Sequence, residues 1–295
     1  MITIHDLVRG ARDRFVSAGI SANLASLDAE VLARQVLGWD KARFLSDRDN
    51  RASSVFLLNY EPLVARRERR EPVSYILGTR EFWGLDFEVG PDVLIPRPET
   101  ELIVEETLTL IRKSSRPLIM DVGTGSGCIA VILAREIAGA RVIATDVSRY
   151  ALNVARRNAA RHGVAERIHF VETSFLDGIS AMADVIVSNP PYVPSISEPG
   201  LTPEVRDYEP PVAVFAGEDG LDGLRAVLEA AAGRLVPHGW LVMEFGCGQD
   251  DGVKSLVDSV GGIDLVKIRH DLQDIPRTVI CRKGREARDE AHEAR

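Results

Sequence analysis

Apolar residues recur at helical spacing through residues 1–78. A first stripe comprises Ile4, Leu7, Val8, Ala11 and Phe15. A second comprises Leu27, Val31, Leu32, Val36 and Leu37. Spacings of three and four residues place each set on one face of an α-helix. Gly38 follows the second stripe and favours a helix end there, because glycine readily adopts the left-handed conformation.

A third stripe, Val55, Leu58 and Val64, predicts a helix that begins at a serine cap at position 53 or 54. The basic run 66–70 follows it. We expect this run to be a solvated helix end, the alternative being a basic docking surface. No catalytic constellation stands out here, so residues 1–78 are expected to form a small helical bundle.

The hydrophobic period changes from helical to alternating after Gly78. Residues 79–96 contain Phe82-Trp83-Gly84 and the alternating run 85–89. Alternation on both sides of a glycine turn predicts a β-hairpin. We expect this hairpin to link two domains.

Short apolar strands then alternate with amphipathic helices. The expected strands are 118–122, 141–145, 168–172, 184–188 and 240–245, with two late strands around Val266 and Val279. The expected helices are 126–137, 151–162 and 221–235. Such alternation predicts a doubly wound α/β fold with a mostly parallel, seven-stranded sheet. Its ligand crevice is expected at the carboxyl ends of the first strands.

These patterns divide the chain into four segments. We expect a helical domain over 1–78, a hairpin linker over 79–96, a catalytic α/β domain over 97–284 and a charged, disordered tail over 285–295.

The charge of the chain is unevenly distributed. Over all 295 residues the formal net charge is −8, but residues 1–80 carry +3 and residues 81–295 carry −11. An acidic catalytic part argues against nucleic acid as the principal substrate.

The three cysteines are far apart and form neither a disulfide framework nor a zinc motif. With no signal peptide and no apolar run long enough for a bilayer, a cytoplasmic protein without a membrane association is expected.

A glycine-rich loop closes the first strand of the expected sheet. It reads Gly123, Thr124, Gly125, Ser126 and Gly127. Glycines at alternate positions let a backbone approach a ligand closely, and the helix start behind them offers free N–H groups. Cys128 stands where a dinucleotide fingerprint has its third glycine, which favours a ligand with an amino-acid moiety and a ribose over a pyrophosphate.

Asp146 ends the second strand and can accept hydrogen bonds from both hydroxyls of a ribose. The loop and this acid together favour a nucleoside-type cofactor over the alternative, a plain tight turn with Asp146 capping the next helix. Ser174 and Phe175 follow the third strand. Phe175 can lie against an adenine ring or pack into the core, and the sequence does not decide between the two.

The fourth strand ends at Asn189-Pro190-Pro191-Tyr192. Two prolines cannot continue a central strand, so they form a stiff turn at the crevice. The Asn189 amide oxygen and the Pro190 carbonyl then form a rigid pair of acceptors for a planar –NH₂ group, with Tyr192 as a flat wall. A plain Asn-Pro turn is the alternative, but it is less expected beside such a glycine loop.

Methyl transfer from S-adenosylmethionine to a conjugated nitrogen is the chemistry that needs such a clamp. The nitrogen lone pair of an amide or aromatic amine is delocalised, so two acceptors that hold both N–H bonds orient it toward the methyl group. The sulfonium is already a good leaving group, so no metal is expected. No Ser/His/Asp arrangement or metal-ligand cluster competes for the site.

The motifs in this order resemble those of the bacterial peptide-chain release factor glutamine methyltransferases, the PrmC/HemK family. The matching segments are Gly78–Gly84, Leu94–Glu101, Gly123–Gly127, Asn189–Tyr192, Tyr208–Pro210 and Gly217–Leu221. The resemblance extends from residue 1 to about residue 283. Asn-Pro-Pro-Tyr alone also occurs in adenine-N6 methyltransferases, so it discriminates only together with the other segments.

This resemblance implies a class I methyltransferase domain behind a helical domain that docks the protein substrate. It also implies N5-methylation of the glutamine in the Gly-Gly-Gln motif of class 1 release factors, which affects translation termination. In this likeness the loop 123–127 and Asp146 hold S-adenosylmethionine, Phe175 lies beside adenine, and residues 189–192 grip the glutamine, with Asn189 also at the cofactor. Asn189, Pro190 and Tyr192 would be the catalytic set. The family commonly has an acidic residue where this chain has Ser174, and Phe82, Arg97 and Glu99 are expected at the pocket rim.

Two further activities use the same clamp. One is glutamine methylation of a ribosomal protein, and the other is adenine-N6 methylation of nucleic acid. No long basic target-recognition region supports the second.

Overall fold

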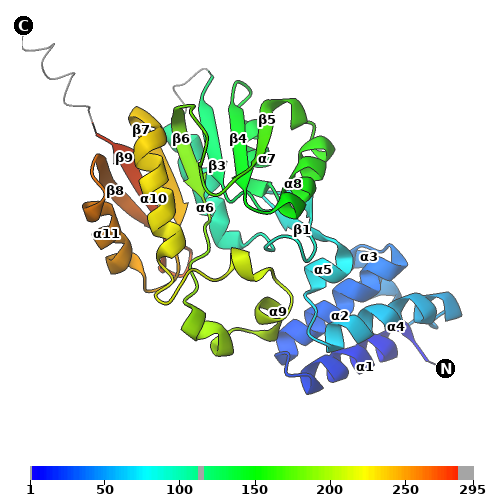
Figure 1. The fold of residues 1–295 in the computed structure, drawn as a ribbon. Coiled ribbons are helices and arrows are strands. Elements are labelled where there is room, and N and C mark those ends of the chain that lie inside the picture. Colours follow the sequence, from blue (N-terminus) through cyan, green and yellow to red (C-terminus); the bar gives the residue numbers. More distant parts are fainter. Residues whose placement is uncertain (1, 112–115, 285–295) are drawn as a thin grey trace, which may run out of the picture. The chain divides into compact units, whose positions relative to one another are not determined.

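The computed structural model describes residues 2–111 and 116–284 (Figure 1). The chain forms two compact units, one of Met1–Thr79 with Thr202–Tyr208 and the other of Arg80–Leu201 with Glu209–Arg295. The segment 202–208 therefore leaves the second unit and joins the first, which the sequence patterns did not indicate. The predicted tail, 285–295, lies outside the described residues.

The first unit is helical. Its helices are α1 (Ile4–Ser17), α2 (Ala22–Leu37), α3 (Lys41–Asp47), α4 (Ser54–Glu68), α5 (Val73–Leu77) and α9 (Pro203–Arg206). Ser53 caps α4 by accepting a hydrogen bond from the Phe56 N–H. Gly38 ends α2 in the left-handed conformation, with φ of 64°. The predicted ends of both helices are thus confirmed.

The apolar stripes located α2 and α4 but only partly their buried faces. Leu27, Val55 and Leu58 are more than half exposed. Ala25 and Ala29 are buried in α2, and Phe56 is buried in α4. Small alanines let the helices of the bundle approach closely, so shape decides the buried face here as much as hydrophobicity does.

The expectation of a solvated end for the basic run 66–70 is wrong at Arg67, whose side chain is only 3% exposed. Its guanidinium pairs with Asp28 at 2.8 Å and with Glu204 of α9 at 2.8 Å. Arg70 binds the same Glu204 carboxylate at 2.7 Å. Burial alone raises the pKa of Glu204, but the hydrogen bonds from Arg70 and Arg67 outweigh it and lower the pKa to about 2.

The hairpin predicted after Gly78 is present as β1 (Thr79–Phe82) and β2 (Leu85–Glu88). Trp83 and Gly84 form the turn with φ of 54° and 72°. Positive φ at both central residues matches the right-handed twist of a two-residue hairpin.

The second unit contains a seven-stranded sheet of order β5-β4-β3-β6-β7-β9-β8. Its strands are β3 (Leu118–Val122), β4 (Arg141–Asp146), β5 (Ile168–Glu172), β6 (Ala183–Ser188), β7 (Leu235–Glu244), β8 (Ile263–His270) and β9 (Pro276–Lys283). The five strands from β5 to β7 pair in parallel, whereas β9 is antiparallel to both neighbours. The predicted doubly wound, mostly parallel seven-stranded sheet is confirmed.

Helices cover both faces of this sheet. The α-helices of the unit are α6 (Glu101–Leu110), α7 (Cys128–Glu136), α8 (Arg149–Arg161), α10 (Asp222–Arg234) and α11 (Asp250–Ser259), and the short 3₁₀ turns are η1 (Pro98–Thr100), η2 (Ala165–Arg167), η3 (Ser195–Gly200) and η4 (Pro211–Ala213). Buried residues of α6, α7 and α8 form one core with one face of the sheet. Those of α10 and α11 form a second core with the other face, where α10 crosses in front of the strands in Figure 1. Within the described residues, no helix has the length and apolar character needed to cross a membrane.

Candidate active site

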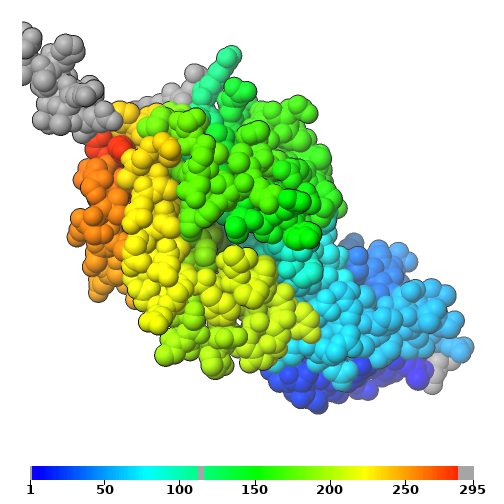
Figure 2. Space-filling model, in the orientation of Figure 1, coloured from blue at the N-terminus to red at the C-terminus, as the bar shows by residue number. Residues whose placement is uncertain are grey.

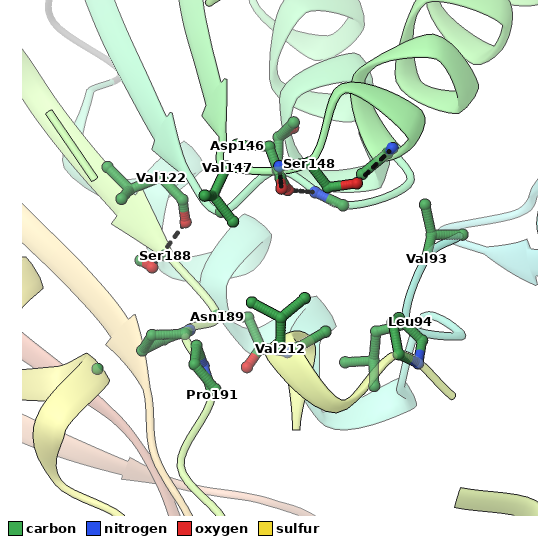
Figure 3. Close-up of a pocket in the computed structure, with 18 of the residues that line it drawn as sticks. Val93, Leu94, Val122, Asp146, Val147, Ser148, Ser188, Asn189, Pro191 and Val212 are labelled. Carbon is green, nitrogen blue, oxygen red and sulfur yellow. Dashed lines mark hydrogen bonds between the residues drawn. The ribbon is translucent and has the colours of Figure 1, made fainter. Parts of the chain in front are cut away.

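The carboxyl ends of β3 and β6 lie side by side at the point where the strand order reverses. From β3 the chain continues to β4 and β5 on one side, and β6 and β7 lie on the other. The Ser188 hydroxyl at the end of β6 donates to the Val122 carbonyl at the end of β3 at 2.7 Å (Figure 3). The loops after these strands carry the two predicted motifs and therefore meet at the topological switch point, where doubly wound folds bind ligands.

A pocket of about 490 Å³ opens at this switch point. Small-molecule sites typically measure roughly 300–1,000 Å³. The lining comes from seven segments of the second unit: 92–100, 122–129, 146–151, 173–175, 188–191, 210–217 and 222–223. Figure 2 shows a hollow between α10 (yellow) and the green surface of the β4–α8 region. In Figure 3, Asp146 and Ser148 lie on one side of the pocket and Asn189 and Pro191 on the other.

The predicted glycine loop, from Gly123 through Thr124, Gly125 and Ser126 to Gly127, lines one side of the pocket or supports it. All three glycines have positive φ, between 54° and 81°. A Cβ on Gly123 or Gly125 would meet no atom within 4 Å, so open space lies before them. A Cβ on Gly127 would lie 2.9 Å from the Ala155 Cβ, so this glycine lets α7 pack against α8.

Asp121 lies fully buried beneath the same loop. Its Oδ2 accepts hydrogen bonds from the Thr124 hydroxyl at 2.6 Å and from the Ala130 N–H at 3.1 Å. Its Oδ1 is buried without a partner among the described residues. Burial raises the pKa of Asp121 to about 7, despite these two hydrogen bonds.

Asp146 ends β4 and lines the pocket as predicted. Its two carboxylate oxygens accept backbone hydrogen bonds, Oδ2 from the Gly125 N–H and Oδ1 from the Ser148 N–H, each at 2.9 Å. Ser148, rather than Asp146, caps α8 through the Ala151 N–H. Each oxygen keeps a second lone pair for a ligand. Burial raises the pKa of Asp146.

Ser174 and Phe175 also line the pocket. Phe175 has a φ of 47°, and its carbonyl accepts a hydrogen bond from the Thr145 hydroxyl at 2.7 Å. Its ring packs partly against the core that includes Leu176. The sequence left open whether Phe175 lies at the pocket or packs into the core. In the structure its side chain does both.

Three of the four residues of the Asn-Pro-Pro-Tyr turn, namely Asn189, Pro190 and Pro191, line the pocket. Tyr192 is not among the lining residues, and its hydroxyl donates to the buried Glu244 carboxylate at 3.1 Å. Burial, reinforced by the charge of Glu244, raises the pKa of Tyr192, so its hydroxyl stays a donor.

Glycines pack closely around this turn. A Cβ on Gly223 would lie 2.5 Å from the Pro191 carbonyl oxygen, and one on Gly220 would lie 2.4 Å from that of Tyr192. The Gln249 side chain donates to the Tyr192 carbonyl at 2.9 Å. The turn is therefore held rigidly from behind by neighbouring backbone.

Two buried residues that the sequence patterns did not single out support Asn189. The Asn189 Nδ2 donates to the Thr100 hydroxyl at 3.0 Å, and this hydroxyl donates to Glu244 Oε2 at 2.7 Å. Burial raises the pKa of Glu244 to about 7, against the lowering effect of the hydrogen bonds from Thr100 and Tyr192. Glu244 could have been noticed in the sequence, because it is an acidic residue at the end of the apolar strand β7.

The rim prediction is wrong for Phe82, which is 1% exposed and packs in the core. Arg97 instead pairs at 2.6 Å with Glu209, whose side chain is 1% exposed. This pair joins the segment before η1 to the segment that precedes the lining residues 210–217. Val93, Leu94 and Val212 supply an apolar part of the wall (Figure 3).

Two family models and several full-length relatives match this chain. Residues 6–78 match the family model of the PrmC N-terminal domain, and residues 100–199 match that of the methyltransferase small domain. A release factor glutamine methyltransferase of Geobacter sulfurreducens is 42% identical, over 96% of this chain and 97% of that protein. One of Nitratidesulfovibrio vulgaris is 39% identical, over 96% of each chain. The chain belongs to the release factor glutamine methyltransferase family.

Solved structures confirm the fold. A methyltransferase from Pyrococcus furiosus superposes with a TM-score of 0.50 at 20% identity, covering 69% of this chain and 91% of that one. The hMettl16 catalytic domain, solved with an RNA hairpin, gives 0.56 at 18% identity, covering 76% and 83%. At these identities the likeness concerns the fold alone, so the RNA ligand stays a property of hMettl16.

Membership in this family also supports S-adenosylmethionine as the cofactor. The glycine loop, Asp146, Phe175 and the first three residues of the Asn-Pro-Pro-Tyr turn are brought to one pocket. The assignment of particular residues to the cofactor and to the substrate stays a prediction.

Proposed function

We propose that this methyltransferase transfers a methyl group from S-adenosylmethionine to the side-chain nitrogen, N5, of the glutamine in the Gly-Gly-Gln motif of class 1 release factors. The observation that carries the proposal is the position of Asn189 and Pro190 beside the glycine loop, in one pocket at the switch point. The enzyme is proposed to act in the cytoplasm, where release factors terminate translation.

The pocket residues fit the cofactor by their chemistry. Open space before Gly123 and Gly125 admits a close backbone approach. Asp146 lines the pocket and retains lone pairs for ribose hydroxyls. Phe175 offers a flat face for adenine. When bound, S-adenosylmethionine supplies an electrophilic methyl group on a sulfonium leaving group.

Asn189 and Pro190 are proposed to hold the glutamine amide. The Asn189 Oδ1 and the Pro190 carbonyl each accept one of its two N–H bonds, which turns the nitrogen lone pair toward the methyl group. The same acceptors stabilise positive charge that develops on the nitrogen. The alkylated amide is acidic, so it loses its proton without a strong base.

Nucleic acid is proposed not to be the principal substrate. Residues 81–295, which contain the whole pocket, carry a formal charge of −11. A net negative charge of this size disfavours a polyphosphate ligand, whereas an enzyme that acts on nucleic acid benefits from basic side chains along the backbone path.

Transfer of labelled methyl groups to three substrates tests the proposal. The full-length enzyme is incubated with labelled S-adenosylmethionine and a class 1 release factor, the same factor with Gln→Ala in its Gly-Gly-Gln motif, or DNA. We expect label on the first substrate only. Equal label on the Gln→Ala factor, or label on DNA, would refute the substrate assignment.

A further inference from the structure

Glu244 is a buried titratable group that the proposed chemistry does not use directly. It ends β7, whose preceding residue Met243 pairs with Ser188 of β6, so Glu244 lies level with Asn189. Its side chain is buried, with the residue 1% exposed. Its Oε2 accepts from the Thr100 hydroxyl at 2.7 Å and its Oε1 from the Tyr192 hydroxyl at 3.1 Å.

The direction of each hydrogen bond in the series Asn189–Thr100–Glu244 follows from which groups can donate and which can only accept. An ionised carboxylate only accepts, so the single Thr100 hydroxyl proton is committed to Glu244. The Thr100 oxygen, itself buried, can then only accept from Asn189, 3.0 Å away. The donor end of the Asn189 amide must therefore face Thr100, which turns its Oδ1 to the other side.

The structure assigns Thr100 and Glu244 the role of positioning residues: together they fix the rotation of the Asn189 amide so that its oxygen, and not its –NH₂ group, meets the substrate. This inference rests on the proposed function. It explains why a neutral asparagine, which presents a donor and an acceptor of nearly equal shape, can be selective for an –NH₂ group.

The opposite rotation of Asn189 is disfavoured on both sides. It would place Oδ1 against the buried Thr100 oxygen, so that two acceptors would face each other without a hydrogen between them, which is unfavourable. It would also point the asparagine –NH₂ group at the substrate –NH₂ group, where neither can accept.

Protonation of Glu244 would remove this directionality. A neutral carboxyl can donate to Thr100, which frees the Thr100 proton for Asn189 Oδ1. Burial raises the pKa of Glu244 to about 7, so both forms are populated near neutral pH. The groups that face it are Thr100 and Glu99 of η1, Tyr192 after β6 and Arg277 of β9; Glu99 raises this pKa and the other three lower it.

Thr100→Val and Thr100→Ser form a matched pair of variants. Valine keeps the shape without the hydroxyl, and serine keeps the hydroxyl. With the release factor as substrate, we expect Thr100→Val to lower kcat by about 10-fold or more, as the loss of one oriented transition-state contact does. Thr100→Ser should stay within about threefold of wild type, and the Kd for S-adenosylmethionine should be unchanged in both within about threefold.

The pH profile of kcat is the second readout. In the wild type kcat should rise as the pH passes about 7, because ionised Glu244 is the competent form. Glu244→Gln cannot ionise and should lack this rise. Wild-type kcat in Thr100→Val, equal losses in both Thr100 variants, a parallel loss of cofactor binding, or an unchanged pH profile in Glu244→Gln would each overturn the assignment. A wild-type enzyme that does not methylate the release factor would instead contradict the proposed function, and the inference with it.

Discussion

At the scale of single residues, the pocket is defined by which polar atoms are already bonded within the protein. The Asn189 Nδ2 donates a hydrogen bond to the Thr100 hydroxyl, so the Oδ1 of Asn189 is the atom available to a ligand. Asp146 has both oxygens on backbone N–H groups and is thereby held in one rotamer. Both side chains are thus oriented before any ligand arrives, which lowers the entropic cost of binding.

Asn189→Ala tests the separation of substrate and cofactor functions. We expect kcat for release factor methylation to fall by about 10²–10³ or more, because one of the two proposed acceptors for the reacting amide is lost. Calorimetric titration should give a Kd for S-adenosylmethionine close to that of the wild type. Asn153→Ala, at an exposed asparagine of α8, is the control and should leave both unchanged. Equal losses of transfer and cofactor binding would show that the role of Asn189 is wrong.

Glu244 couples pH to stability with a definite sign. Its pKa is raised from 4.5 to about 7 in the folded protein, so the stabilisation by its protonated form is complete below pH 4.5 and is lost as the pH rises through 7. Between pH 5 and pH 8 we expect the free energy of unfolding of Glu244→Gln to improve relative to wild type by up to about 3 kcal/mol.

Urea denaturation at pH 5 and pH 8 measures this difference. Asn153→Ala, which alters an exposed side chain of α8 that does not titrate, is the control and should show no such change. A difference between wild type and Glu244→Gln that is independent of pH would contradict the expectation.

Residue positions were predictable where local order sets them. Gly123, Asp146 and Asn189 each follow a recognisable strand, and parallel strands bring their carboxyl ends together. Thr100 reaches Asn189 across 89 residues of sequence, and Glu244 reaches Thr100 across 144. Contacts of this kind depend on strand order and helix placement, which the local pattern of apolar residues does not contain.

At the scale of elements, periodicity identified the strands better than the faces of helices. A strand such as β3 or β6 is buried on both faces and appears as a short apolar run. The direction of the Tyr192 side chain could not be predicted from the periodicity of the chain. Its predicted place beside the clamp followed from chain position, whereas its side chain is directed to Glu244.

The contact between α7 and α8 supports the glycine loop 123–127 from behind. Gly127→Ala would combine a φ of 81° with a Cβ 2.9 Å from that of Ala155. Gly163→Ala shares the positive φ, at 70°, but its Cβ would meet no atom within 4 Å. We expect Gly127→Ala to lower the free energy of unfolding by about 1–3 kcal/mol more than Gly163→Ala does, because only it adds overpacking. If chemical denaturation showed the same loss of unfolding free energy in both variants, the effect would come from backbone strain alone and overpacking against Ala155 would be excluded.

In the molecule as a whole, the chain passes between the two units three times, after residues 79, 201 and 208. After the Asn-Pro-Pro-Tyr turn, residues 202–208 belong to the helical unit, and the chain then returns to line the pocket with residues 210–217. Glu204 holds this segment on Arg67 and Arg70. Arg67 and Glu204 are 137 residues apart in the sequence. The basic run 66–70, considered with its neighbours in sequence alone, therefore gave no sign of this ion pair.

Glu204→Gln tests this attachment, with Asp207→Asn, at an exposed pair with Arg206, as control. Loss of the Glu204 charge leaves buried Arg67 paired with the Asp28 carboxylate and bonded to the Glu71 carbonyl, so we expect the free energy of unfolding of the helical unit to fall by about 1–3 kcal/mol. Hydrogen exchange over 202–208 should accelerate in Glu204→Gln and not in Asp207→Asn. Because the pKa of Glu204 is lowered to about 2, this stabilisation is present above pH 4.5 and is lost as the pH falls toward 2. Equal exchange in both variants would contradict the attachment.

The position of the transferred methyl group on the release factor is the decisive test of the proposed reaction. A class 1 release factor is incubated with the enzyme and S-adenosylmethionine, and its peptides are sequenced by tandem mass spectrometry. We predict one methyl group on the side-chain nitrogen of the glutamine in Gly-Gly-Gln, formed about 10²-fold or more slowly by Asn189→Ala. A methyl group on any other residue, or an unmodified Gly-Gly-Gln peptide, would contradict it.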